Sequence, residues 1–159
     1  MAFFIGCGIV LRKAGKYILV QEVRGEKSGY FNLPAGTLET DEDLLQCITR
    51  EAKEETGTDI TVEHFLGIYQ TVIASGNNVV FAIFTGSVAD DAIFHSDEHS
   101  IVKALTYQEI VELDSLHKLR APTVLRAIED FRAGKTLPVG AVQSWRLDTL
   151  PAITVLGNH

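Results

Sequence analysis

Residues 36 to 58 read GTLETDEDLLQCITREAKEETGT, and this stretch decides the fold. Its apolar residues recur at helical spacing, which predicts a helix over about 41–56 that ends at Gly57. Thr40 is expected to cap the start of this helix, because an acidic residue, Asp43, follows it three positions later.

Three carboxylates share one face of the predicted helix. At about 100° per residue, Glu51, Glu54 and Glu55 fall within one arc of roughly 100°. Like charges one turn apart destabilise a helix by roughly a few tenths of a kcal/mol per pair, and acids near its C-terminal end oppose the helix dipole. Arg50 and Lys53 offset part of this repulsion, but a hard divalent cation such as Mg²⁺ or Mn²⁺ would offset it more completely. A solvated acidic face is the alternative interpretation, since charged faces are common on surface helices.

The spacing of the whole stretch resembles the Nudix box, G-x5-E-x7-R-E-U-x-E-E-x-G-U, where U is a bulky aliphatic residue. Seven specified residues match: Gly36, Glu42, Arg50, Glu51, Glu54, Glu55 and Gly57. At a usage of roughly 6% per residue type, chance agreement anywhere in the chain is on the order of one in a million. The preceding residues 32–36, NLPAG, look like the proline-glycine loop of that family, with Ala35 where many members have glycine. Ala52 and Thr58 occupy the aliphatic positions, which affects packing more than charge.

The resemblance implies hydrolysis of a nucleoside diphosphate linked to another moiety. Water attacks phosphorus while divalent metals, Mg²⁺ or Mn²⁺, neutralise the phosphate oxygens. By similarity, Glu51 and Glu55 are expected to bind metal, and Glu54 is expected either to be a third ligand or to orient Arg50. The backbone carbonyl of Ala35 is expected to complete the set of metal ligands.

Other residues are assigned supporting roles by the same resemblance. Glu42 is expected to contact the metal ligands rather than the metal itself, and Gly36 is expected to let the backbone come close to the metal. The general base is either a box glutamate or an acid of the loop 89–100, in which Glu98 is favoured; an exposed acid that keeps the loop soluble is the alternative for Glu98. The predicted catalytic residues are therefore Arg50, Glu51, Glu54 and Glu98.

Substrate phosphates require cations. The candidates are Arg12, Arg24 and Lys27, which lie on the predicted hairpin or the following loop, where the family's substrates approach, and Arg24 is the favoured phosphate ligand. Phe31 is the candidate to stack on a base of the substrate, and packing against the sheet is the alternative, since aromatics at strand ends are more often core residues.

The rest of the chain predicts an α/β fold of the α+β kind. Strands are expected at 5–11 and 17–23, which form a hairpin, and at 60–62, 65–73, 79–88 and 101–105, with helices at 107–113 and 122–132. This order resembles the α/β/α sandwich of the Nudix family, in which a mixed β-sheet has the box helix on one face and the C-terminal helix on the other. One Nudix domain is expected over 1–136, followed by a tail over 137–159 that either stays separate or packs on the domain.

Composition limits the classes of partner. The chain has 159 residues and a formal net charge of -7, the wrong sign for a protein that binds nucleic-acid polymers by neutralising phosphates. No apolar run approaches the roughly 20 residues that cross a bilayer, so we expect no membrane contact and a cytoplasmic location. Cys7 and Cys47 are too few for a disulfide framework and are expected to be reduced thiols. A small nucleotide or diphosphate is the expected partner, and a homodimer is left open.

Within the family, the likeness is to bacterial NudJ-type phosphatases, which act on nucleoside tri- and diphosphates and on a thiamine-precursor pyrophosphate. It is carried by the segments at 15–20, 34–39, 119–122 and 133–135. Val72 and Ile73 stand where dinucleoside polyphosphate and ADP-ribose hydrolases tend to have tyrosine or proline, which argues against both classes. The other hypothesis is a catalytically idle Nudix fold that binds a nucleotide and regulates a partner. It predicts the loss of a box carboxylate, and none is lost.

Overall fold

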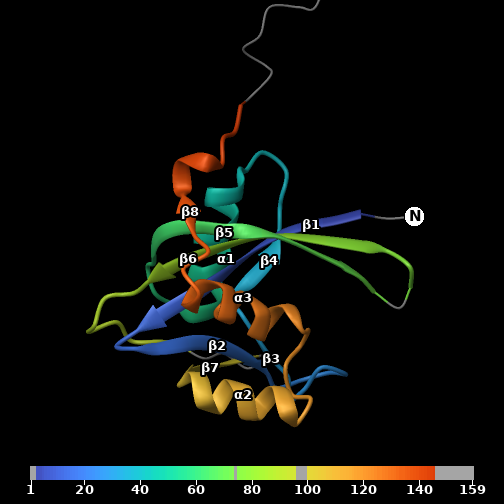
Figure 1. The fold of residues 1–159 in the computed structure, drawn as a ribbon, viewed down its shortest axis with the longest axis vertical. Helices are drawn as coiled ribbons and strands as arrows, with labels where there is room; N and C mark the ends of the chain where they lie inside the picture. The colour runs from blue at the N-terminus through green and yellow to red at the C-terminus, as the bar shows by residue number, and fades with distance from the viewer. Residues whose placement is uncertain (1–2, 74, 96–99, 146–159) are drawn as a thin grey trace, which may run out of the picture.

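The computed structural model describes residues 3–73, 75–95 and 100–145, which form a mixed β-sheet between two layers of helix. Its elements are β1 (Phe3–Lys13), β2 (Lys16–Glu22), β3 (Phe31–Asn32), β4 (Ala35–Thr37), α1 (Leu44–Thr56), β5 (Thr61–Val72), β6 (Asn78–Ser87), β7 (Ser100–Leu105), α2 (Tyr107–Ser115), α3 (Thr123–Arg132), β8 (Leu137–Pro138) and the short 3₁₀ helix η1 (Val139–Ala141). α1 packs on one face of the sheet, and α2 and α3 pack on the other (Figure 1). This arrangement confirms the predicted fold class.

The sheet topology brings the loop before α1 into the middle of the sheet. The strand order is β3-β2-β1-β6-β5-β8, with β1 and β6 parallel and β1 and β2 joined by a hairpin. Away from the hairpin, β1 pairs with β4, and β2 pairs with β3. The segment between β2 and α1 therefore contains two short strands, and Ala35 and Gly36 pair directly with Gly8 and Cys7.

The core consists of two clusters, one on each face of the sheet. Successive strand residues point to opposite faces, so Val10 faces α3 while Ile9 and Leu11 face α1. Both faces are covered, which explains why the strands read as continuous apolar runs. Cys7 and Cys47 belong to the cluster under α1 and are buried free thiols.

The box helix α1 (Leu44–Thr56) starts later than predicted. Asp43, and not Thr40, is the N-cap: its carboxylate accepts two backbone N–H groups of the first turn, at 2.9 and 2.8 Å. The side chain of Gln46 accepts the backbone N–H of Asp43 at 2.9 Å and completes the capping box. Asp41 has a φ of 68°, a left-handed conformation that separates Thr40 from the helix.

The end of α1 is as predicted. Gly57 has a φ of 73° and its N–H donates to the carbonyl of Lys53, at 2.8 Å. A Cβ at this position would lie 2.7 Å from the side chain of His95. The backbone N–H of His95 donates to the carbonyl of Thr56. Both the backbone conformation and the close approach of the 88–95 segment therefore require glycine here.

One continuous strand replaces two predicted ones. β5 runs from Thr61 to Val72, where strands at 60–62 and 65–73 were expected. Its pairing with β6 shifts register between Val62 and His64 and again between Phe65 and Gly67. Such β-bulges break the alternation of apolar residues on which the prediction depended.

The chain contacts the sheet beyond residue 136. Leu137 and Pro138 pair with Phe65 and His64 as β8, and Val142 packs against the cluster under α1. The domain boundary at 136 stays a prediction, but these residues lie on the folded unit rather than apart from it.

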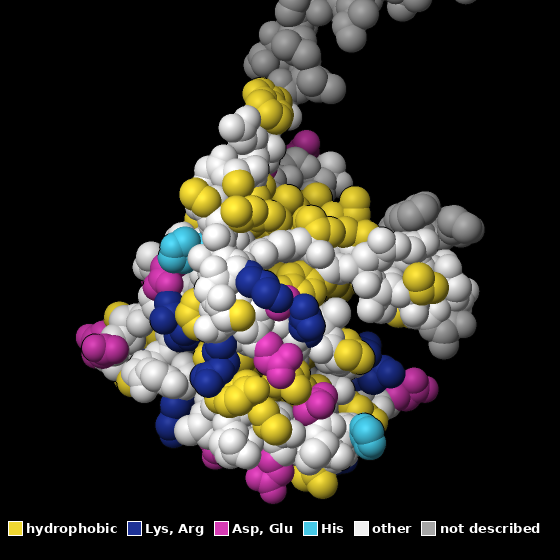
Figure 2. Space-filling model, viewed as in Figure 1, with side chains coloured by type: hydrophobic (Ala, Val, Ile, Leu, Met, Phe, Trp, Pro, Cys, Tyr) yellow, Lys and Arg dark blue, Asp and Glu magenta, His cyan; other side chains and the backbone are white. Residues whose placement is uncertain are grey.

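The surface over α3 carries charges of both signs. Acidic and basic side chains are interspersed on this face (Figure 2), and Asp130 accepts from both Arg126 and Lys135. No helix in the described part of the chain is long and apolar enough to cross a membrane.

Candidate metal centre

The loop between β3 and β4 meets the C-terminal half of α1. The backbone N–H of Ala35 donates to Oε2 of Glu55 at 2.9 Å. The N–H of Ile9 in turn donates to the carbonyl of Pro34 at 3.0 Å, which fixes the loop against β1. Two parts of the predicted site, the proline-glycine loop and the box helix, are therefore in direct contact.

Glu55 is a partly buried carboxylate in an acidic surrounding. Burial raises its pKa to about 8; the hydrogen bond from Ala35 opposes this, and the negative charges of Glu51, Glu22 and Glu54 reinforce it. Within residues 3–73, 75–95 and 100–145, no Lys or Arg forms an ion pair with Glu55. An ionised carboxylate there needs a cation, and the oxygen-rich surroundings suit a hard divalent ion.

Glu51 lies directly over the backbone of Gly36. A Cβ on Gly36 would lie 1.9 to 2.2 Å from the carboxylate atoms of Glu51, far inside any contact distance. The glycine is therefore required by the position of this carboxylate and not by a special φ. The Glu51 side chain is 15% exposed, so solvent reaches part of it.

One guanidinium organises the remaining carboxylates. Arg50 donates to both oxygens of Glu42, at 3.0 and 2.6 Å, and to Oε1 of Glu51 at 2.8 Å. It also donates to the carbonyl of Thr37 at 3.1 Å and lies 3.4 Å from Glu54. The hydrogen bond from Arg50 lowers the pKa of Glu42 to about 2, and the same contacts raise the pKa of Arg50. Glu42 is thus a fixed anion that holds Arg50 in place for Glu51.

Arg50→Lys is expected to destabilise this network, because an ammonium group cannot reproduce a bidentate contact to Glu42 together with a contact to Glu51. Breaking a largely buried ion pair costs roughly 3–5 kcal/mol, and the retained charge reduces that, so we expect a loss of about 1–3 kcal/mol in the free energy of unfolding. Urea denaturation measures it. Lys53→Ala, which removes an exposed pair with Asp59, is the matched control and should cost under about 1 kcal/mol. An equal loss of stability in the two variants would contradict a stabilising role of the contacts made by Arg50.

The three box carboxylates do not form one compact cluster. Glu55 bonds to Ala35, Glu51 bonds to Arg50, and Glu54 is 61% exposed beside Arg50. In the described residues, no three Asp, Glu, His or Cys side chains converge closely enough to hold a metal ion. The contact with Arg50 favours the second of the two roles predicted for Glu54, and the metal-ligand roles of Glu51, Glu55 and Ala35 stay predictions.

Sequence reasoning missed Glu22. It is the last residue of β2, the strand that pairs with β3, and its negative charge contributes to the raised pKa of Glu55. An acid that ends an apolar strand just before the loop was the available signal, but strand pairing is what places it near the box helix. The sheet therefore adds a carboxylate to those of α1.

The remaining predicted residues are Arg24, Glu98 and Phe31. Arg24 is exposed in the loop after β2, and Glu98 lies outside the described residues, so both roles stay predictions. Phe31 is 9% exposed and packs in the cluster that faces α3. This packing favours the alternative, core role for Phe31 over stacking on a base.

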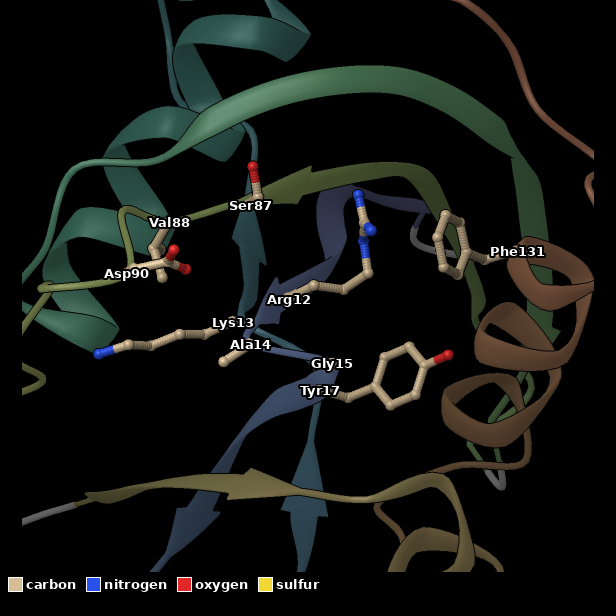
Figure 3. Close-up of a pocket in the computed structure, with 9 residues that line it drawn as sticks. All are labelled: Arg12, Lys13, Ala14, Gly15, Tyr17, Ser87, Val88, Asp90 and Phe131. Carbon is tan, nitrogen blue, oxygen red and sulfur yellow. The ribbon is translucent and has the colours of Figure 1, made fainter.

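A separate cavity of about 360 Å³ is lined in part by the turn between β1 and β2 (Figure 3). Arg12 lies there with its guanidinium 4.7 Å from the ring centre of Phe131 and is paired with Glu63. Arg12 is four positions along β1 from Gly8, the partner of Ala35, and Phe131 belongs to α3, on the face opposite α1. The cavity is therefore not part of the candidate metal centre.

Comparisons with known proteins agree with the motif and the fold. A family model described as a NUDIX domain matches residues 4–128. Phosphatase NudJ of Escherichia coli K12 is 28% identical over 131 residues, which cover 82% of this chain and 84% of that protein. A solved NUDIX hydrolase from Nitrosomonas europaea aligns with a TM-score of 0.80 and 31% identity over 91% of this chain and 98% of the other. The NUDIX domain of Shewanella oneidensis NrtR, solved with ADP ribose, shares the fold at 23% identity and a TM-score of 0.67, over 84% of this chain and 89% of that one.

Proposed function

Because this chain belongs to the Nudix family of hydrolases, which act on phosphoanhydride bonds, we propose that it is a Mg²⁺-dependent pyrophosphohydrolase. Its substrate is a nucleoside di- or triphosphate or a related small diphosphate such as a thiamine-precursor pyrophosphate. The likeness to a phosphatase NudJ over most of both chains supports this substrate class. Assembly as a homodimer and the absence of a nucleic-acid partner stay predictions.

One observation carries the proposal most directly. Glu55 is a partly buried carboxylate surrounded by the charges of Glu51, Glu22 and Glu54, and it contacts the backbone of Ala35. Such a group is unfavourable as an anion without a cation. Its partner Ala35 is followed by Gly36, where a side chain would exclude Glu51, and this supports a site built for a divalent ion.

Each residue then has a defined task. Glu51, Glu55 and the carbonyl of Ala35 would hold the metal, which neutralises phosphate charge and makes bound water a better nucleophile. Arg50 holds the carboxylate of Glu51 in one orientation, and Glu42 holds Arg50. The proton of the attacking water goes to a box glutamate or to Glu98.

The experiment is phosphate and pyrophosphate release from a panel of substrates, each with Mg²⁺, with Mn²⁺ and with EDTA. The panel holds nucleoside di- and triphosphates, a thiamine-precursor pyrophosphate, ADP-ribose and a dinucleoside polyphosphate. We expect turnover of the simple nucleotides or the thiamine precursor that EDTA abolishes. Turnover confined to ADP-ribose or the dinucleotide would contradict the substrate class.

A catalytically idle fold makes a different prediction in the same assay. It would show no turnover of any substrate, while a nucleotide or Mg²⁺ still raises the melting temperature by binding the folded state. The chain keeps every box carboxylate, which favours catalysis.

A further inference from the structure

A second arginine lies at the rim of the candidate metal centre. The guanidinium Nε of Arg120 is 3.6 Å from Oε1 of Glu22, and the two side chains are 40% and 39% exposed. Glu22 is close enough to the box helix for its charge to affect Glu55. Arg120 is therefore a cation beside a carboxylate-rich site whose other arginine, Arg50, already holds Glu42 and Glu51.

The backbone on both sides of this pair is fixed. Phe31 donates its N–H to the carbonyl of Lys118 at 2.8 Å, and Arg120 donates its N–H to the carbonyl of Phe31 at 2.7 Å. Glu22 donates its N–H to the carbonyl of Tyr30 at 3.0 Å. The segment before α3 is thus attached to β3, the strand that leads into the proline-glycine loop.

Strand alternation places the pair on the side of the sheet that carries the box helix. Leu19 faces α3 and Ile18 faces α1, so Glu22, four positions after Ile18, is on the α1 side of β2. Leu119 is buried among the residues that face α3 and bridges to Phe31, and Arg120 follows it in a bend, from which its guanidinium reaches Glu22 on the α1 side. The ion pair to Glu22 agrees with this placement.

The pair is weak enough to exchange partners. A separation of 3.6 Å is too long for a hydrogen bond, and an exposed ion pair contributes little to stability. A guanidinium forms stronger, bidentate contacts with phosphate oxygens than a single long contact with a carboxylate. A diphosphate arriving at the centre would therefore compete successfully for Arg120.

We propose that Arg120 is a substrate-binding residue that takes a phosphate of the bound di- or triphosphate, and that Glu22 is its partner until the substrate arrives. The proposal rests on the proposed function, because the substrate is taken to be a diphosphate. Arg120, in the segment before α3, would then bind phosphate in addition to Arg24, for which the sequence predicts the same role.

The test uses inorganic pyrophosphate as the probe, titrated calorimetrically in Mg²⁺ against wild type, Arg120→Ala, Arg120→Lys and Arg126→Ala. Arg126 is the matched control, since it is an exposed arginine that pairs with Asp130 on α3, away from the centre. We expect Arg120→Ala to raise the Kd at least about tenfold, Arg120→Lys to restore part of the loss, and Arg126→Ala to leave the Kd unchanged. For the best nucleotide substrate, Arg120→Ala should raise KM by a similar factor and change kcat by less than about threefold.

Glu22→Gln tests whether Glu22 competes with the substrate for Arg120 or helps to hold Arg120 in its binding position. Because Glu22 is proposed to compete for the guanidinium, this variant should bind pyrophosphate as tightly as wild type or more tightly. A loss as large as that of Arg120→Ala would contradict the exchange of partners.

The outcomes distinguish this proposal from the proposed function. An Arg120→Ala variant with wild-type Kd and KM overturns the role of Arg120 even if the enzyme is active. No turnover by wild type with any substrate contradicts the proposed function, while the pyrophosphate titration still decides on Arg120. Absence of pyrophosphate binding by wild type overturns the proposal for Arg120 as well.

Discussion

Glu55→Gln is expected to lower kcat by at least about 10²-fold at saturating Mg²⁺, the order of loss seen when an electrostatic group is removed from a transition state. The amide oxygen of glutamine can still accept the N–H of Ala35, so the contact between loop and helix is retained while the charge is lost. Steady-state kinetics measures kcat, and a melting curve shows that the variant is folded. A kcat within a few-fold of wild type would contradict the metal role of Glu55.

The same substitution has a predicted effect without metal. The folded-state pKa of Glu55, about 8, is raised from an ordinary value of 4.5, so the folded protein holds this proton over a pH range in which the unfolded chain has lost it. The contribution of Glu55 to stability therefore falls as pH rises from about 4.5 to about 8. In EDTA, Glu55→Gln should be more stable than wild type at pH 8, and the difference should shrink toward pH 5. A difference that does not depend on pH would contradict the shifted pKa.

Gly36→Ala is expected to lower kcat by about 10²-fold or more. Its Cβ would lie 1.9 to 2.2 Å from the Glu51 carboxylate, which must then leave the position in which it accepts from Arg50. A displacement of about 1 Å at a catalytic centre is enough to cost on the order of 10² in rate. Steady-state kinetics in Mg²⁺ measures the loss.

Gly140→Ala is the matched control for this substitution. A Cβ at Gly140 meets no atom within 4 Å, and the residue lies in η1, which contributes no residue to the candidate metal centre. The control should keep wild-type activity. Equal activity of the two alanine variants would show that the approach of Glu51 to Gly36 is unimportant for catalysis.

The start of the box helix shows what local sequence can and cannot decide. The stretch contains two candidate capping boxes, Thr40 with Asp43 and Asp43 with Gln46, and both fit the spacing. The left-handed conformation of Asp41 selects the second. The apolar stripe of α1 and its end at Gly57 were predictable, because they depend on helical periodicity and on a glycine at the left-handed position.

Among the charged residues of the site, too, some were predictable from the sequence and others were not. The box spacing was sufficient to select Glu42, Arg50 and Glu51, which the structure joins through one guanidinium. Glu22 belongs to no motif, and Arg120 lies in the segment 119–122, which indicated a likeness to NudJ-type phosphatases but no role for the arginine. Their position depends on the pairing of β2 with β3 and on the bridge between Phe31 and Leu119, which are contacts between distant segments that periodicity does not encode.

The most direct test of the metal centre is Mn²⁺ binding measured by electron paramagnetic resonance, which counts free Mn²⁺ and so needs no substrate. Wild type should bind Mn²⁺, Mg²⁺ should displace it, and a variant that carries both Glu51→Gln and Glu55→Gln should lose this binding while remaining folded. Binding of Mn²⁺ by the double variant with wild-type affinity and stoichiometry would contradict the assignment of the metal to the box carboxylates.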